Sequence, residues 1–310
     1  MDDVNPLSIE VGDALLGERL DRAVSVVADV SRSVAGRTIE LGLVLVNGEV
    51  KRSKSLRLAL GDLLEVDMVP STPVFHPSIE LSILYFDEAL LLVDKPAGLI
   101  VHANTLSDQT PTLASAVVMI DPGIATVGDE PALRPGIYQR LDKSTSGVMG
   151  VARTQEAFVS LKEQVGSHAM RRQYRALVEG ELDEDEGVID APLGRDQRSR
   201  TRVAVIAEGR HAVTYFRVIE RFDGYSYVEL TLETGRTHQI RVHMSAIGHP
   251  LVGDRAYGGD PSLLEDRVFL HSHVLGLTHP VHGAFLQVTS PLPPELTAVL
   301  VKLADRSARA

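Results

Sequence analysis

The chain has 310 residues, of which 44% are hydrophobic and 24% charged, and it contains no cysteine. This length and composition are typical of a globular protein with two domains, and the lack of cysteine excludes disulfides, thiolate metal sites and cysteine nucleophiles. No apolar run approaches the roughly 18 residues of a membrane helix, and the acidic amino terminus has no apolar segment like that of a secretory signal. We therefore expect a cytoplasmic protein that does not bind membranes.

The net charge of −11 argues against a protein that coats nucleic acid by bulk attraction. Most of this charge lies in residues 1–14, with four acids and no bases, and in residues 181–186, with five acids. We expect both segments to be solvated tail or loop. Basic clusters at residues 51–54, 171–172 and 195–202 still allow a local basic surface.

Residues 15–69 form a first unit in which helix signals precede strand signals. Residues 17–24 begin a helix with apolar residues at helical spacing, and residues 31–41 form a second helix with an N-cap in Ser-Arg-Ser. Residues 44–50 predict a strand, an Asn-Gly turn and a return strand. Residues 63–67 alternate as a further strand.

The order of short motifs in this unit resembles the S4 RNA-binding domain. The motifs are Arg-Leu-Asp, Ser-Arg-Ser, Gly-x-Val-x-Val-Asn-Gly, Lys-x-Ser and Gly-Asp. The resemblance implies one cationic surface at the start of the second helix and at the hairpin, with contacts from Arg19, Ser31, Arg32, Arg37, Asn47, Lys51 and Lys54. Helix N-termini and cationic side chains suit phosphates. The alternative is a solvated charged face, because eight acids match the eight bases of the unit.

Residues 70–79 contain three prolines and predict an extended linker. Residues 80–310 are rich in strand patterns and form the second domain. The expected strands cover residues 83–86, 90–94, 172–179, 202–206, 212–218 and 225–232, and the expected helices cover residues 154–164 and 239–247. Because strands outnumber helices and hairpin spacings dominate, we expect an α+β domain on a mixed or antiparallel sheet.

Residues 136–147 are the most informative segment of the chain. They place one carboxylate, Asp142, between the cations Arg140 and Lys143 and before a Thr-Ser-Gly turn. A carboxylate held in this way can stay ionised at neutral pH and act as a nucleophile or a base. A solvated loop of ordinary turn residues is the alternative.

The order Arg-Leu-Asp, basic residue, Thr-Ser-Gly resembles the catalytic motif of the RluA/RluD family of pseudouridine synthases. Four further segments match that family in the same order, so that the likeness covers nearly all of residues 80–290. They are the Lys-Pro-x-Gly turn at 95–98, the tyrosine strand at 172–180, the Thr-Gly-Arg-Thr-His-Gln-Ile-Arg run at 234–241 and Gly-His-Pro-Leu-Val-Gly-Asp at 248–254.

The resemblance implies an enzyme that isomerises uridine to pseudouridine in RNA, with a pseudouridine synthase catalytic domain behind an S4 head. An S4 domain in this family points to 23S ribosomal RNA of the large subunit, with transfer RNA as the alternative substrate. The reaction gains and loses no atoms and involves no redox step, so we expect neither cofactor nor metal. We also expect a monomer whose partner is RNA.

The resemblance also implies a role for each matching residue. Asp142 matches the catalytic aspartate, Arg241 the arginine that pairs with it, and Tyr174 the tyrosine that stacks on the flipped base and can take its C5 proton. Arg140 matches the arginine that enters the RNA helix in place of the extruded uridine. Further RNA contacts are predicted for Arg236, His238 and Gln239.

Each of these residues has a structural alternative. Tyr174 could be half-buried core on its strand, Arg241 could form an ion pair elsewhere, and the run from Arg236 to Gln239 could be a polar helix cap. Gln139 stands where histidine is common in the family, and it loses the titratable proton. We expect this change to affect structure or contact and not the chemistry.

Three readings from other classes remain open. A glycoside or nucleoside hydrolase needs a second carboxylate, for which Glu233 and Asp254 are candidates. A metal enzyme is suggested by paired histidines such as His271 and His273, although the spacing of known metal motifs is missing. The S4-like unit also permits a non-catalytic RNA-binding or ribosome-assembly protein.

Overall fold

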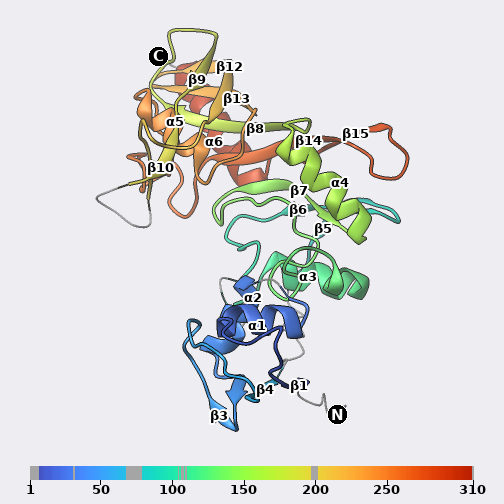
Figure 1. The fold of residues 1–310 in the computed structure, drawn as a ribbon. Helices are drawn as coiled ribbons and strands as arrows, with labels where there is room; N and C mark the ends of the chain where they lie inside the picture. Colours follow the sequence, from blue (N-terminus) through green and yellow to red (C-terminus); the bar gives the residue numbers. More distant parts are fainter. Residues whose placement is uncertain are drawn as a thin grey trace. The chain divides into compact units, whose positions relative to one another are not determined.

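The computed structural model describes residues 7–30, 32–67, 79–103, 105, 108, 110–196 and 202–308, and gives only the backbone of residues 33, 34 and 37. The chain separates into two compact units, the first ending at Pro73 and the second beginning at Val74 (Figure 1). The predicted linker at residues 70–79 lies outside the described residues, except for Ile79. No helix of the described part is long and apolar enough to cross a bilayer.

The first unit packs two helices against a four-stranded antiparallel sheet. The helices are α1 (Leu20–Val27) and α2 (Arg32–Glu40), and the sheet has the order β1-β4-β2-β3. The strands are β1 (Leu7–Glu10), β2 (Val44–Val46), β3 (Glu49–Val50) and β4 (Leu63–Val66). The core forms because the apolar stripe of α1 and the inward residues of β2 and β4 bury together, with Leu20, Val24, Ile39, Val44 and Leu64 fully enclosed.

Strand β1 corrects the expectation that residues 1–14 are solvated tail. Leu7 to Glu10 pair antiparallel with Val66 to Leu63 of β4. All four residues of β1 remain exposed, so the strand is held by backbone hydrogen bonds and buries no apolar face. The alternation Leu7-Ser8-Ile9-Glu10 is a strand pattern, but it covers only four residues of an acidic segment and its apolar side chains stay exposed.

The second unit is an α+β domain on a mixed nine-stranded sheet, as predicted. The order is β5-β6-β7-β14-β8-β13-β12-β9, with β15 beside β14, and a separate hairpin pairs β10 with β11. The strands are β5 (Ser82–Phe86), β6 (Leu90–Lys95), β7 (Ser146–Ala152), β8 (Arg171–Glu179), β9 (Glu186–Asp190), β10 (Leu193–Arg195), β11 (Val203–Val205), β12 (Val213–Phe222), β13 (Tyr225–Leu232), β14 (Leu270–Thr278) and β15 (Phe285–Thr289).

Two halves of this sheet meet where β14 lies beside β7, and these two strands run parallel (Figure 1). The other strand pairs of the sheet are antiparallel within the described chain. The meeting point needs a glycine, because Gly147 has φ +114° and a Cβ there would lie 2.2 Å from the backbone oxygen of Ser272. The Thr-Ser-Gly motif is therefore the place where the two halves touch.

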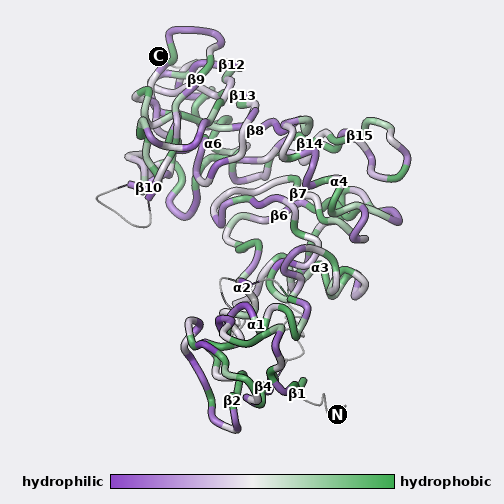
Figure 2. Tube along the Cα trace, viewed as in Figure 1, coloured by the Kyte–Doolittle hydropathy of each residue, from purple (hydrophilic) through white to green (hydrophobic). Residues whose placement is uncertain are grey.

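Helices cover this sheet and complete its core. α4 (Gln155–Gly166) and α5 (Gln239–Ala246) match the predicted helices, whereas α3 (Leu113–Ile120), the 3-10 turn η1 (Pro122–Thr126) and α6 (Pro294–Ser307) were not predicted. Figure 2 shows the hydrophobic colour along most of α3, whose residues Leu113 to Val118 are all buried. A helix that is apolar all round carries no 3.6-residue period, so its sequence does not show its type.

Candidate active site

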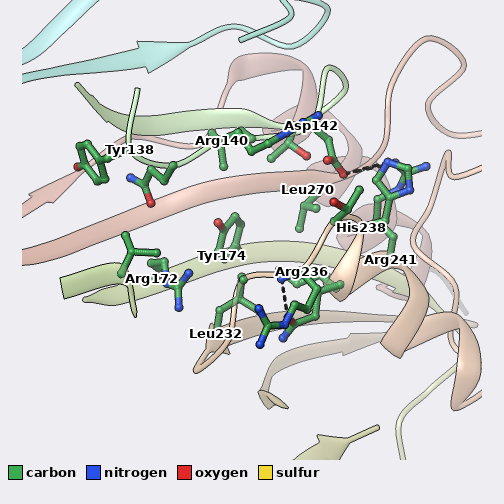
Figure 3. Close-up of a pocket in the computed structure, with 18 residues that line it drawn as sticks. Tyr138, Arg140, Asp142, Arg172, Tyr174, Leu232, Arg236, His238, Arg241 and Leu270 are labelled. Atoms are coloured by element: carbon green, nitrogen blue, oxygen red, sulfur yellow. Dashed lines mark hydrogen bonds and ion pairs between the residues drawn. The ribbon is translucent and has the colours of Figure 1, made fainter. Parts of the chain in front are cut away.

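A cavity of about 270 Å³ opens beside the junction of the two half-sheets. Figure 3 shows side chains from the loop before β7, from β8, from the loop before α5 and from α5 itself converging on it. Eighteen residues line it: Tyr138, Gln139, Arg140, Leu141, Asp142, Thr145, Val165, Arg172, Tyr174, Leu232, Gly235, Arg236, Thr237, His238, Gln239, Ile240, Arg241 and Leu270. All of the predicted site residues of the second unit are among them.

Asp142 stands in a turn that is fixed on both sides. Its carbonyl accepts a hydrogen bond from the backbone N–H of Thr145 at 3.1 Å. Ser146, the first residue of β7, bonds to Nδ1 of buried His271 at 2.9 Å and accepts from Nη2 of Arg267 at 2.6 Å. His271 Nε2 donates to the carbonyl of Ser290 at 3.2 Å, and burial lowers the pKa of His271 to about 4, so Nδ1 of the neutral ring accepts the Ser146 proton. The turn is thus anchored in the core while the Asp142 carboxylate stays 18% exposed at the cavity.

Arg241 on α5 pairs with two carboxylates. Its Nε and Nη2 donate to both oxygens of Asp254, at 2.7 and 2.8 Å, and its Nη1 reaches Oδ2 of Asp142 at 3.4 Å. The Asp142 contact implied by the resemblance is present, and so is an ion pair elsewhere, which is the shorter of the two. Asp254 is 1% exposed, so this two-point pair holds the guanidinium in place.

His238 completes the environment of Asp142. Its Nε2 lies 3.8 Å from Oδ2 of Asp142, and its Nδ1 hydrogen-bonds the hydroxyl of Tyr257 at 2.8 Å. The residue has φ +56°, a backbone conformation that residues other than glycine rarely adopt. Burial lowers the pKa of His238, and Asp142 opposes this effect. The strained backbone turns this side chain toward the carboxylate at the start of α5.

Tyr174 is 8% exposed and belongs to the apolar cluster around the cavity. It is part of the core, and its ring also forms a wall of the cavity (Figure 3). Burial raises the pKa of Tyr174, while the positive charge of Arg172 opposes the rise. The phenol is therefore protonated at neutral pH.

Arg140 and Gln139 lie at the rim of the cavity. Arg140 is exposed and makes no ion pair within the described residues. Gln139 is half-buried beside it. The structure does not explain why glutamine stands here where histidine is common in the family. An exposed, unpaired arginine next to the carboxylate keeps its charge available for a ligand.

The predicted RNA contact at Gln239 needs correction. Gln239 is 2% exposed, and its amide accepts from Thr234 and from the backbone of Arg236 and donates to Val213 and Thr214. These four bonds use the amide completely, so Gln239 is a structural residue that ties α5 to β12. The polar-cap alternative therefore holds for this position.

Arg236, by contrast, stays half-exposed at the cavity. Its Nε donates to the carbonyl of His211 at 2.9 Å, and it has no carboxylate partner within the described part of the chain. Burial, together with the positive charges of Arg210 and Arg172, lowers the pKa of Arg236. This edge of the cavity is consequently cationic.

Lys95, in the Lys-Pro-x-Gly turn, is a site residue that sequence reasoning missed. It is fully buried, and its ammonium donates to the carbonyls of Pro96, Leu99 and Lys143 at 2.9, 2.8 and 3.4 Å. Burial lowers the pKa of Lys95 to about 7. Since Lys143 follows Asp142, this side chain ties the early turn to the loop that carries the carboxylate.

The predicted RNA-binding cations of the first unit are mostly paired within that unit. Arg19 and Arg32 both bond to Asp21, Lys51 to Glu49 and Lys54 to Glu40. They nevertheless keep 31–58% of their side chains exposed. Ser31 and the side chain of Arg37 lie outside the described residues.

Asn47 has a structural role in the first unit. Its amide donates to Asp62 at 2.8 Å and accepts from the backbone of Leu63 at 2.8 Å, and its φ is +54°. Asparagine tolerates this left-handed turn position. Asn47 therefore shapes the hairpin, and its exposed side chain keeps one amide hydrogen that these two bonds do not use.

The geometry also weakens two of the other readings. Asp254 is committed to Arg241, and Glu233 accepts from the hydroxyl of Tyr215 at 2.7 Å on an exposed edge. Neither offers a free second carboxylate for a hydrolase. No group of three or more histidines and acids that could hold a metal occurs among the described residues.

Comparison with known proteins identifies the class. The family model described as RNA pseudouridylate synthase matches residues 89–246, and the S4 domain model matches residues 18–64. The solved structure of human RNA Pseudouridylate Synthase Domain Containing 1 superposes with a TM-score of 0.57 at 28% identity, covering 76% of this chain and 98% of that one.

Similarity to relatives extends over nearly the whole chain. Ribosomal large subunit pseudouridine synthase D of Pseudomonas aeruginosa is 40% identical, with 99% of each chain covered. The protein of the same description from Xanthomonas campestris is 39% identical, with 97% of this chain and 93% of that one covered. The chain belongs to the RNA pseudouridylate synthase family and carries an S4 domain. It is an isomerase that converts uridine to pseudouridine in RNA.

Proposed function

We propose that this enzyme modifies ribosomal RNA of the large subunit and that Asp142 is its catalytic carboxylate. The observation that carries the second part is the placement of Asp142 at the cavity, within 3.4 Å of Arg241. The substrate rests on the relatives, since the Pseudomonas and Xanthomonas proteins are described as acting on the large ribosomal subunit. Transfer RNA is the second candidate.

Asp142 acts at the bond between ribose C1′ and uracil N1. That bond breaks, the base turns, C5 joins C1′, and the reaction ends when C5 loses its proton and N1 gains one. An ionised carboxylate can serve as a nucleophile or a base in such a sequence. Arg241, fixed by Asp254, pairs with the carboxylate and holds it aimed at the cavity.

Arg140 and Tyr174 prepare the base for this step. A uridine must leave the helix to reach the cavity, at a cost of a few kcal/mol. Arg140 is exposed beside Asp142 and offsets part of that cost by taking the vacated space with a hydrogen-bonding cation. The ring of Tyr174 lines the cavity wall and supplies a stacking surface for the uracil.

The S4 unit holds the RNA outside the cavity. Arg19, Arg32, Lys51 and Lys54 are partly exposed, ion-paired cations. Such surface pairs are screened by solvent and contribute little to stability, so a phosphate can replace the acid at little cost. We further propose that residues 15–69 form this RNA-binding domain, that residues 80–310 form the catalytic domain, and that the protein acts as a monomer in the cytoplasm.

Tritium release from 5-tritiated uridine tests the function. Purified full-length protein is incubated with large-subunit rRNA and tRNA transcripts, and we expect release from the rRNA only. Asp142→Asn, which keeps the shape and removes the charge, is expected to lose release by at least about 10³-fold. Asp305→Asn on exposed α6 is the matched control and keeps full activity.

Three outcomes would contradict the proposal. Activity that persists in Asp142→Asn removes that residue from the chemistry. Tritium release from the tRNA transcript alone would show that tRNA, and not large-subunit rRNA, is the substrate. RNA binding without release by the wild-type protein supports a non-catalytic assembly role.

A further inference from the structure

Arg172 on β8 is a buried cation that the reaction as described above does not use. It is 6% exposed and lines the cavity. Its Nη2 donates to the carbonyl of Glu233 at 2.7 Å, and its Nε has no hydrogen-bond partner within the described residues. The loop leaves room for it, since a Cβ at Gly235 would lie 2.5 Å from Arg172 Nη1.

The charge of Arg172 is uncompensated, unlike that of other buried arginines. Arg241 pairs with Asp254 and Arg267 with Glu295, whereas Arg172 has no carboxylate within ion-pair distance in the described part of the chain. Burial accordingly lowers the pKa of Arg172 from its ordinary value. A buried, unpaired charge is costly unless a ligand completes it, and this one faces a cavity.

The position of Arg172 in the cavity places it near the uracil base of a bound uridine and away from the ribose. Arg172 and Tyr174 are two residues apart on one strand, so they project to the same face. In Figure 3, Tyr174 lies between Arg172 and Asp142. A uracil stacked on Tyr174 with its C1′ near Asp142 therefore presents its far edge, with a ring carbonyl, to the guanidinium.

The reaction generates negative charge on that edge. If the C1′–N1 bond breaks heterolytically, its electron pair goes to N1 and spreads to O2 and O4 of the uracil anion. If Asp142 instead adds to C6, the electrons of the C5–C6 double bond move to O4. A fixed donor aimed at such developing charge typically contributes a factor of about 10²–10³ to kcat.

We propose that Arg172 is a catalytic residue that stabilises the negative charge developing on the uracil ring by donating a hydrogen bond to a ring carbonyl oxygen. The cation transfers no proton, and the charge returns to the ring bonds when C5 joins C1′. This inference rests on the proposed role of Asp142 at the sugar end of the cavity.

The test compares Arg172→Gln with Arg171→Gln. Arg171 is the exposed neighbour on the opposite face of β8, where it bonds to Gln287. With an RNA stem-loop that the wild type modifies, we expect Arg172→Gln to lower kcat by about 10²-fold and to change Kd by less than about 3-fold. Arg171→Gln should change neither. Arg172→Lys, which keeps the charge, should recover part of the lost rate.

Sulfur substitution locates the contacted oxygen. The target uridine is replaced by 4-thiouridine or 2-thiouridine, since sulfur accepts hydrogen bonds weakly. One of the two should slow the wild type and have no additional effect on Arg172→Gln. A slowing of the same factor in both proteins, for both substitutions, would overturn the contact.

A second measurement needs no turnover, so it separates failure of this inference from failure of the proposed function. Barbituric acid carries a uracil-like ring as an anion at neutral pH. Its binding to the wild type and to Arg171→Gln, followed by NMR, should be at least about 10-fold tighter than to Arg172→Gln. The same affinity for all three proteins would rule out recognition of the ring anion by Arg172.

Discussion

Asp254 holds Arg241 by two hydrogen bonds, at 2.7 and 2.8 Å, and thereby directs the third nitrogen of the guanidinium at Asp142. The pair is buried, so water does not compete for either partner. The precision of the site at Asp142 thus depends on a carboxylate that lies behind the arginine, away from the cavity.

Asp254→Asn is expected to lower kcat by about 10–100-fold with little change in RNA affinity. The amide keeps the volume but loses the charge that fixes both nitrogens, so Arg241 shifts relative to Asp142, and a misplacement of about 1 Å can cost about 10²-fold. Single-turnover tritium release measures the rate. Asp260→Asn, at an exposed position of the same loop whose carboxylate accepts from Ser262, is the control, and equal rates in the two variants would contradict the prediction.

Tyr174→Leu is expected to weaken binding of target RNA by about 5–150-fold, which corresponds to the 1–3 kcal/mol of a base stacked on an aromatic ring. Tyr174→Phe keeps the ring and should bind within about 2-fold of the wild type. Filter binding with the stem-loop substrate gives both affinities. If the phenylalanine variant lost as much affinity as the leucine variant, the hydroxyl and not the ring face would be the main contact.

Gly147→Ala is expected to destabilise the second unit by about 2–4 kcal/mol. The new Cβ would meet the backbone oxygen of Ser272 at 2.2 Å, and φ is +114°. Gly166→Ala at the end of α4 meets nothing within 4 Å and should be neutral or slightly stabilising. Urea unfolding followed by circular dichroism compares them, and matching midpoints for the two variants would refute the close approach.

Lys95 gives a pH dependence of stability with a defined sign. Its pKa is about 7 in the folded chain and about 10.4 when unfolded. Between these values the unfolded state binds one proton more, so the contribution of Lys95 to the free energy of unfolding rises with pH by about 1.4 kcal/mol per unit. Below pH 7 both states are protonated and the contribution is at its minimum.

Lys95→Met removes this dependence. The stability of the wild type minus that of the variant should therefore be flat from pH 5 to 6 and should rise by about 1.4 kcal/mol per pH unit from pH 7 to 9. Urea titrations at each pH provide the difference, in which the other titrating groups cancel. A difference that stays constant from pH 6 to pH 9 would show that Lys95 keeps its proton in the fold.

The strand-rich fold could be predicted because several strands alternate clearly. β13 buries every second residue, from Ser226 to Leu232, and that period is visible in the sequence. α3 could not be predicted because it is apolar on nearly all sides. β1 could not be predicted because its alternation of Leu7 and Ile9 with polar residues is only four residues long and lies in an acidic segment. Contacts with segments that are distant in the sequence decide both structures: β1 pairs with β4, and α3 packs in the core of the second unit.

Within the site, motif order located Asp142, Tyr174 and Arg241 in one cavity, but not the residues behind them. Lys95 is fully buried, and Asp254 is buried where it pairs with Arg241. A charged residue in a loop gives no local sign in the sequence that it will be buried. Gln239 was misread for the same reason, since its four partners come from β12 and from the preceding loop.

The place of β14 in the sheet governs when the enzyme can become active during synthesis. β7 and β8 follow each other in the chain, but residues 270–278 of β14 must enter between them. A ribosome-bound chain that ends before this segment has Asp142 and Tyr174 on two half-sheets that are not yet joined. Catalytic competence therefore arrives in one step, only after β14 has been synthesised, and a truncation that removes β14 leaves no partly active enzyme.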